Sequence, residues 1–234
     1  MKTSIVFTAY SANINLAQMS MTALANIRKY TDPDDYELIV IDNEPKNSIK
    51  DDYGALKLGS DGHYIINEKD IGYPASMNQG AKLANGEFLL FMENDILVWE
   101  NWLPDLKYYL KHDLADTISP DQIPRTREEV LNFRKKSYEE SMMPGIQEQG
   151  MIMMRKELFE KTGGWEEKYW KFFCWPPFTQ KLSELNARVS CTTKVQISHI
   201  CGATVYDNYS KDKVKFDADM KLEADMLNKE KNVE

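Results

Sequence analysis

The segment that organises the chain reads Asn67-Glu-Lys-Asp-Ile-Gly-Tyr-Pro-Ala-Ser-Met-Asn-Gln-Gly-Ala-Lys-Leu-Ala-Asn-Gly-Glu-Phe-Leu-Leu-Phe-Met-Glu-Asn-Asp95. A Gly-Tyr-Pro loop at 72–74 opens a short helix of small residues, and Gly86 ends it. The apolar run from Phe88 to Met92 then predicts a buried strand. Three polar residues follow this strand directly: Glu93, Asn94 and Asp95.

Further strands precede this segment and are separated by polar or helical stretches. Short apolar runs predict strands at 4–7, 38–41 and 63–66, and residues 16–30 have the apolar spacing of a helix. This alternation predicts an α/β fold with a Rossmann-like, mostly parallel central sheet flanked by helices. No Gly-x-Gly-x-x-Gly follows any of these strands, so the dinucleotide-binding fingerprint is absent.

Polar residues collect at the predicted carboxyl ends of these strands. Asp42 and Asn43 follow the second strand, as Glu93 to Asp95 follow the strand at 88–92. An open α/β sheet binds ligands at this edge, where carboxylates can hold a hard divalent cation against a diphosphate. The residues themselves therefore indicate a nucleotide-sugar site.

The second half of the chain has weaker signals. We predict a helix face over 99–110, short strands at 117–120 and 150–154, a helix over 179–187 and a last strand at 195–199. Residues 121–147 are charged and irregular, and indicate either a mobile acceptor-side loop or a solvated helix. The aromatic run at 169–178 has two interpretations, since aromatic rings stack on sugars or bases and also fill cores.

Composition narrows the class of protein. The 234 residues are 42% hydrophobic, enough for a real core, and the net charge of -8 argues against electrostatic coating of nucleic acid. The three cysteines form no Cys-x-x-Cys pair, so we expect neither a disulfide framework nor a zinc site, and a cytoplasmic location. We also expect no signal peptide, because Lys2 leads directly into the strand at 4–7 without a longer apolar region. We expect no transmembrane segment, because no apolar run approaches roughly 20 residues.

Taken together, residues 3–205 resemble the family 2 glycosyltransferases of the GT-A fold. The resemblance lies in the opening loop at 5–10, the acidic turn at 40–43, the Asn/Gly pattern of 67–86, the acidic end of the 88–92 strand and the unit at 151–165. It implies one glycosyltransferase domain over 1–205, with a nucleotide-sugar and metal half at 1–98 and an acceptor half at 99–205. We expect residues 206–234 to form a helical tail, whose apolar stripe predicts packing on the body or homo-oligomer formation.

The resemblance also implies roles for individual residues. Asp95 and His199 are the expected ligands of Mn²⁺ or Mg²⁺, although a lone histidine after an apolar strand is also commonly a structural, hydrogen-bonded residue. Donor binding is expected of the following residues: Thr8, Ala9, Tyr10, Asp42, Asn43, Asn67, Gly72, Asn78, Glu93 and Asn94.

The chain departs from the family at the catalytic base. Inverting members carry an acidic pair where this chain has Cys174-Trp175, and neither residue can deprotonate a hydroxyl as a carboxylate would. Another acid could substitute, the reaction could retain configuration without such a base, or catalysis could be lost. We select Glu148 over Glu166 and Glu167 as the substitute, with a solvent-exposed loop position as its alternative.

The expected activity is metal-dependent transfer of a sugar from a nucleoside diphosphate sugar, a UDP-sugar in our prediction, to an acceptor hydroxyl. A glycan or polysaccharide is the first choice of acceptor. The second is hydroxymethylated pyrimidine in DNA, as in phage-type enzymes, with a flipped base stacked on Trp170, Phe173 or Trp175. A non-catalytic nucleotide-sugar or glycan-binding protein is the third alternative.

Overall fold

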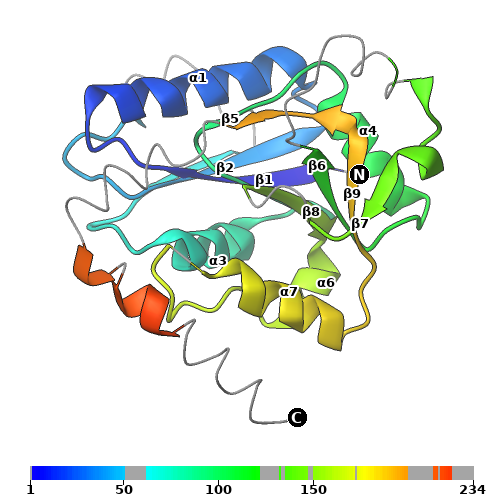
Figure 1. The fold of residues 1–234 in the computed structure, drawn as a ribbon. Coiled ribbons are helices and arrows are strands. Elements are labelled where there is room, and N and C mark those ends of the chain that lie inside the picture. The colour runs from blue at the N-terminus through cyan, green and yellow to red at the C-terminus, as the bar shows by residue number, and fades with distance from the viewer. Residues whose placement is uncertain are drawn as a thin grey trace, which may run out of the picture.

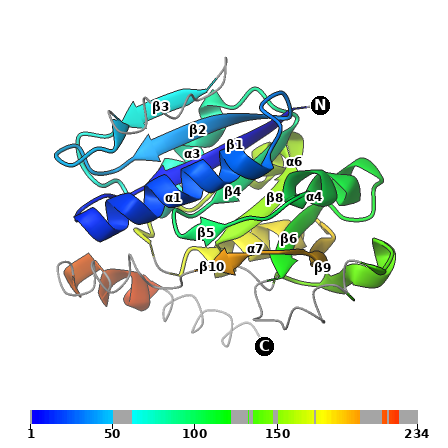
Figure 2. The same cartoon turned by 90° about the horizontal axis from the view of Figure 1, so that it is seen from above.

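One eight-stranded sheet forms the centre of the molecule in the order β3-β2-β1-β4-β8-β6-β9-β7 (Figure 2). The computed structural model describes residues 2–50, 62–121, 132, 135–146, 150–171, 173–199, 213–215 and 217–222. The strands of the sheet are β1 (Thr3–Ala9), β2 (Tyr36–Asp42), β3 (His63–Ile66), β4 (Phe88–Met92), β6 (Thr117–Asp121), β7 (Met142–Pro144), β8 (Met151–Arg155) and β9 (Val189–Gln196).

Helices cover both faces of the sheet, so the molecule has three layers (Figure 1). Helices α1 and α4 pack on one face, and α3, α6 and α7 pack on the other. Their bounds are α1 (Ile14–Tyr30), α3 (Tyr73–Leu83), α4 (Trp102–Lys111), α6 (Lys156–Thr162) and α7 (Trp175–Glu184), with a 3-10 turn, η1, at Glu139–Ser141. No helix among the described residues has both the length and the apolar character needed to cross a membrane.

The strand directions confirm the predicted parallel arrangement in the first half of the chain. Strands β3, β2, β1 and β4 run parallel, whereas β8 runs antiparallel to both β4 and β6. Side chains of β1 alternate between the two cores: Ile5 and Phe7 face the α1 layer, and Val6 faces the α3 layer. Both faces are buried, which explains why these strands are continuous apolar runs rather than alternating ones.

A buried carboxylate fixes the turn that leads into β4. Glu37 of β2 is 2% exposed, and its Oε1 accepts hydrogen bonds from the Ser4 hydroxyl, the Asn85 amide (2.6 Å) and the Gly86 amide (3.1 Å). A Cβ at Gly86 would lie 2.6 Å from Ser4 Oγ, so glycine is required by this close approach. The turn therefore sets where β4 begins, and with it the position of the acids that follow.

Two predicted boundaries in the second half are wrong. Strand β9 begins at Val189, not at 195, and is followed by a separate strand, β10 (Ser198–His199), that pairs with β5 (Ile96–Leu97). The start of β9 was not predicted because residues 190–193 form no strongly apolar run. These residues are nevertheless buried, and the Thr192 hydroxyl lies 2.6 Å from the Tyr109 hydroxyl. Helix α7 begins at Trp175, because the two prolines that follow occupy its first turn, where proline needs no amide hydrogen bond.

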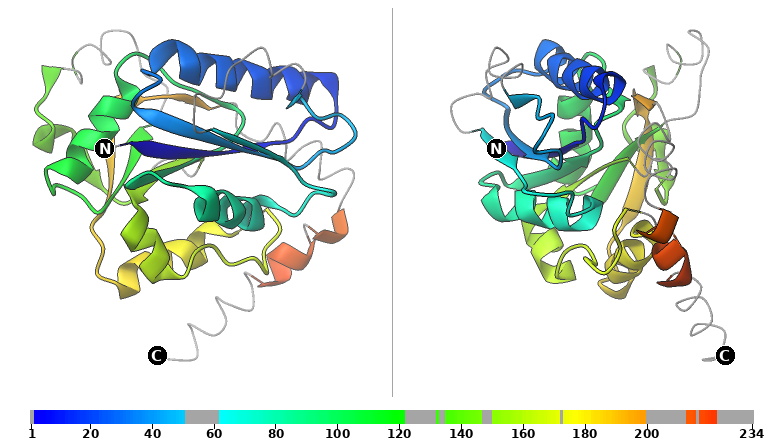
Figure 3. Two further views of the ribbon diagram at one scale, coloured as in Figure 1. Left: turned by 180° about the vertical axis from the view of Figure 1, so that it is seen from behind. Right: turned by 90° about the vertical axis from the view of Figure 1, so that its left-hand side faces the viewer.

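Residues 213–215 and 217–222 are helical, and we call them the C-terminal helix (Figure 3). The helix packs on the body through Asp219, which is 2% exposed, while Met220 is 42% exposed. The other members of the predicted apolar stripe, Phe216, Ala224 and Leu227, lie outside the described residues.

Candidate metal and nucleotide site

A cluster of three potential metal ligands lies just beyond the carboxyl end of β4. Glu93 and Asp95 follow this strand, and the Glu93 amide donates to the Gly150 carbonyl at 2.9 Å, next to β8. His199 comes from β10 and is paired with Ile96 of β5. Because β5 starts directly after Asp95, this pairing brings residues about a hundred positions apart into one cluster.

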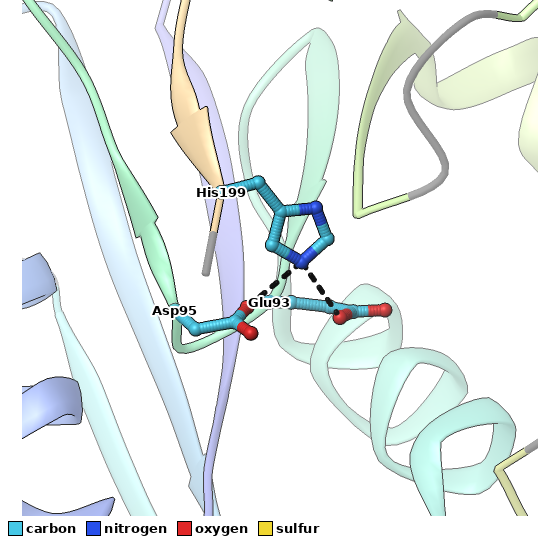
Figure 4. Close-up of side chains that lie close together, drawn as sticks. All are labelled: Glu93, Asp95 and His199. Carbon is cyan, nitrogen blue, oxygen red and sulfur yellow. Dashed lines mark ion pairs between the residues drawn. The ribbon is translucent and has the colours of Figure 1, made fainter. Parts of the chain in front are cut away.

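The three side chains point toward one another (Figure 4). His199 Nε2 lies 3.0 Å from Asp95 Oδ1 and 3.6 Å from Glu93 Oε2. Asp95 is 2% exposed and Glu93 is half-buried, so the cluster has a closed side and an open side.

This cluster fits a divalent cation. One ligand atom from each of Glu93, Asp95 and His199 lies within 4.8 Å of the others. Asp95 Oδ1 is fully buried and makes no hydrogen bond within the described part of the chain, a costly arrangement that a cation would relieve. Two carboxylates and one imidazole suit Mn²⁺ better than Mg²⁺, which prefers oxygen ligands alone.

Asp42 and Asn43 form a hydrogen-bonded platform at the carboxyl end of β2. Asp42 is fully buried, and its carboxylate accepts from the Tyr64 hydroxyl at 2.7 Å and the Glu44 amide at 3.0 Å. Asn43 accepts from the Asn67 amide group at 2.9 Å. Because these contacts fix both side chains, the platform is rigid before any ligand arrives.

The loop after β1 runs beside this platform. The Ala9 carbonyl accepts from the Asn43 amide at 3.1 Å, and Thr8 pairs with Ile41 of β2. Tyr10 is half-buried, and the Lys171 ammonium lies 4.1 Å from the centre of its ring. The structure thus brings the predicted donor residues Thr8, Ala9 and Tyr10 to the same edge as Asp42 and Asn43.

Three other residues that were predicted to bind the nucleotide donor make structural contacts. Asn94 is buried, and its side chain donates to Ser20 of α1 at 3.0 Å. The Asn78 side chain donates to the Trp165 carbonyl at 2.9 Å and accepts from the Trp165 amide at the same distance. Gly72 has a φ of 84°, and a Cβ there would lie 2.2 Å from the Trp170 carbonyl oxygen. These contacts fasten α3 and β4 to their neighbours.

Cys174, at the position of the expected acidic pair, is no base. It is fully buried at the start of α7, and its thiol donates to the Lys171 carbonyl at 3.7 Å. Burial, together with the negative charge of Glu93, holds the pKa of this thiol well above its usual range. Cys174 therefore stays protonated and uncharged at neutral pH.

The glutamates considered as substitutes differ in their surroundings. Glu166 lies 2.7 Å from Lys181, and the Lys181 hydrogen bond lowers the pKa of its carboxyl, which makes it a weaker base. Glu167 accepts from Asn78 at 2.8 Å. Glu148 lies outside the described residues.

Lys171 and Asp70 were not predicted as site residues. Their side chains form an ion pair of 3.1 Å and are only 15% and 14% exposed. Lys171 lies in the aromatic run at 169–178, in which Tyr169, Cys174, Trp175 and Phe178 are all buried. No spacing signal could have found this pair, because Asp70 and Lys171 are a hundred positions apart.

The fold is the GT-A type of glycosyltransferases. The sequence of residues 4–177 matches the family described as "Glycosyl transferase family 2", and the chain belongs to this family. A search of curated protein sequences finds no match.

Solved structures support the fold. GalNAc-T7 with UDP, GalNAc and Mn²⁺ superposes with a TM-score of 0.67 at 16% identity over 85% of this chain. The Pyrobaculum calidifontis mannosyltransferase PcManGT, in complex with GDP-Man and Mn²⁺, gives 0.65 at 15% identity over 85%. A Staphylococcus aureus TarS fragment gives 0.63 at 18% identity over 92%. The chain spans 44%, 56% and 65% of the length of these three structures, respectively.

Proposed function

We propose that this glycosyltransferase moves a sugar from a UDP-sugar to an acceptor hydroxyl, with Mn²⁺ bound by Glu93, Asp95 and His199. The observation that carries the proposal is the buried Asp95 carboxylate, which faces His199 Nε2 at 3.0 Å beside the half-buried Glu93. GalNAc-T7 with UDP and PcManGT with GDP-Man, both with Mn²⁺, support a nucleotide-sugar donor in this fold.

Two groups of residues would bind different parts of the donor complex. Asp95, His199 and Glu93 would hold the cation, which supplies positive charge against the diphosphate that leaves with the nucleotide. Asp42, Asn43 and Asn67 form the rigid platform for the base and ribose, because hydrogen bonds already hold Asp42 to Tyr64 and Asn43 to Asn67.

The acceptor side of the proposal rests on Glu148 as the general base. Cys174 stays protonated, and Glu166 and Glu167 are engaged with Lys181 and Asn78. Glu148→Gln should therefore abolish transfer while leaving donor binding intact. Full transfer activity in this variant would remove Glu148 from the mechanism.

A glycan is our proposed acceptor. The DNA alternative places a flipped base on Trp170, Phe173 or Trp175. Of these, Trp175 is 6% exposed and packs edge-on against Trp165 at 4.9 Å, and two lysines lie over the Trp170 ring. Sugar incorporation into hydroxymethylated duplex DNA would reverse this choice. We also propose a cytoplasmic location, supported by Cys174, whose buried thiol donates to the Lys171 carbonyl and forms no disulfide.

The test of the metal site is thermal unfolding with Mn²⁺ and a series of UDP- and GDP-sugars. At a hundredfold excess over Kd, a bound ligand adds about 2.7 kcal/mol, which corresponds to a rise in Tm of about 5–10 °C for a chain of this size. Asp95→Asn should lose the Mn²⁺ shift and metal-dependent release of UDP, because the amide cannot offer an anionic ligand.

The matched control is Asp113→Asn, which changes a carboxylate that is 85% exposed. It should keep the full Mn²⁺ shift. Equal Mn²⁺ shifts in Asp95→Asn and Asp113→Asn would show that the cation binds elsewhere, and no donor-dependent shift in the wild type would contradict the glycosyl-donor proposal.

A further inference from the structure

Two lysines lie over the ring of Trp170. Lys171 Nζ lies 4.7 Å from the centre of the Trp170 ring, and Lys215 Nζ of the C-terminal helix lies 4.1 Å from the same ring. Like charges this close repel each other unless an anion lies between or beside them. Two positive charges therefore lie close to the Trp170 ring.

Lys171 is the member of this pair that faces the donor residues. It lies over Tyr10, whose loop follows β1, and it pairs with Asp70 at 3.1 Å. Burial lowers the pKa of the Lys171 ammonium, while Asp70 and Glu93 act in the opposite direction. One carboxylate thus does not replace all the hydration that this ammonium has lost, and a second anion would stabilise it.

The backbone at this lysine is fixed from two sides. Both Asp219 carboxylate oxygens accept from the Trp170 amide, at 2.9 and 3.1 Å, and one also accepts from the Lys171 amide at 3.0 Å. On the other side, the Trp170 carbonyl accepts from the Tyr73 amide at 2.7 Å. The C-terminal helix therefore holds Lys171 against the start of α3.

The charges of the site call for such a cation. Glu93 and Asp95 bring two negative charges to the cluster, which a divalent cation only balances. A diphosphate adds further negative charge, so a second positive group lowers the cost of bringing the donor in. Lys171 can supply it, because it lies over Tyr10 and, against the effect of burial, the negative charge of Glu93 raises the pKa of its ammonium.

We propose that Lys171 binds the diphosphate of the nucleotide donor, exchanging its Asp70 partner for a phosphate oxygen, and that Asp219 of the C-terminal helix is its positioning residue. This proposal rests on the proposed function above. The competing explanation is that Lys171 only neutralises Asp70.

A double-mutant cycle separates these explanations. UDP affinity is measured by calorimetry in saturating Mn²⁺ for the wild type, Lys171→Met, Asp70→Asn and the double variant, which removes both charges and leaves none unpaired. We expect Lys171→Met to weaken UDP binding by about 10- to 100-fold, the loss of one charge-assisted contact. Asp70→Asn should bind UDP at least as tightly as the wild type, and the double variant should be as weak as Lys171→Met. Wild-type affinity in the double variant would overturn the proposal.

Asp219 is tested in the same assay. Asp219→Ala should weaken UDP binding in the wild-type background, and Asp219→Asn, which keeps one acceptor oxygen, should weaken it less. In the Lys171→Met background, Asp219→Ala should cause no further loss, because it acts through Lys171. An equal loss in both backgrounds would reduce Asp219 to a general structural role and overturn its assignment.

The result also distinguishes this proposal from the function on which it rests. A wild-type protein that binds neither UDP nor GDP with Mn²⁺ contradicts the donor assignment and this inference with it. Tight UDP binding that survives in the double variant leaves the glycosyltransferase proposal standing and removes Lys171 alone.

Discussion

Replacing Glu37 by glutamine should lower the free energy of unfolding by about 2 kcal/mol at pH 7. Its Oε1 accepts from the Ser4 hydroxyl, the Asn85 amide and the Gly86 amide. A hydrogen bond to a charged group contributes about 1 kcal/mol more than a neutral one, so three bonds lose about 3 kcal/mol. Because Glu37 is 2% exposed, the substitution also removes the cost of burying its charge, which offsets part of this loss of stability.

The same residue should make stability depend on pH. Burial alone would raise the pKa of Glu37, but the hydrogen bonds from Ser4, Asn85 and Gly86 outweigh it and hold the pKa below its usual value of 4.5. A carboxyl group whose pKa is lower in the folded state stabilises the protein above its unfolded-state pKa. That contribution disappears as the pH falls through the folded-state pKa.

Urea denaturation between pH 3 and 7 measures both effects. The difference between wild type and Glu37→Gln should be constant above about pH 5 and should shrink steadily below about pH 4.5. The control is Glu87→Gln, which removes an exposed ion pair with Arg155 next to the same turn and should cost less than about 1 kcal/mol. A Glu37→Gln difference that stays the same from pH 7 to 3 would refute the assignment of these hydrogen bonds to the charged form.

Two glycine substitutions test close backbone approaches. Gly72→Ala should weaken UDP binding as well as destabilise the fold, because its Cβ would lie 2.2 Å from the Trp170 carbonyl that helps to hold Lys171. The control is Gly163→Ala, which is also at positive φ but has open space around it. This variant should lower the free energy of unfolding by only about 1–2 kcal/mol and leave UDP binding unchanged. Equal UDP affinities in the two variants would contradict this. Gly80→Ala should cost about 1–3 kcal/mol by thermal unfolding, because its Cβ would lie 2.3 Å from Val6 Cγ1, and a smaller residue in Val6→Ala should relieve that cost in the double variant. Simple additivity of the two costs would argue against the contact.

The first half of the chain could be predicted because its sequence signals are local. An apolar run from Phe88 to Met92 followed at once by Glu93 and Asp95 predicts both a buried strand and the acids at its end. The structure confirms this strand and its parallel neighbours with nearly the predicted bounds. Here one short window of sequence contains both the element and the residues that it presents.

The rest depends on contacts between distant segments. Strand β9 has serine and threonine at buried positions, and only the position of Tyr109 on α4 explains why a hydroxyl is stable there. The role of His199 depends on the pairing of β10 with β5, two strands of two residues each. Strands this short have no periodicity, so no pattern in the chain could predict that pairing.

The pairing of β5 with β10 also determines when, during synthesis, the three side chains of the metal cluster can come together. At about 5–20 residues per second, a ribosome adds His199 several seconds after Asp95. During that interval Phe88 to Met92 can already pair with β1, but Glu93 and Asp95 have no imidazole partner. The proposed metal site is thus complete only once residue 199 has been added, so a nascent chain arrested before it should display the two acids without capturing Mn²⁺ through the full set of three ligands.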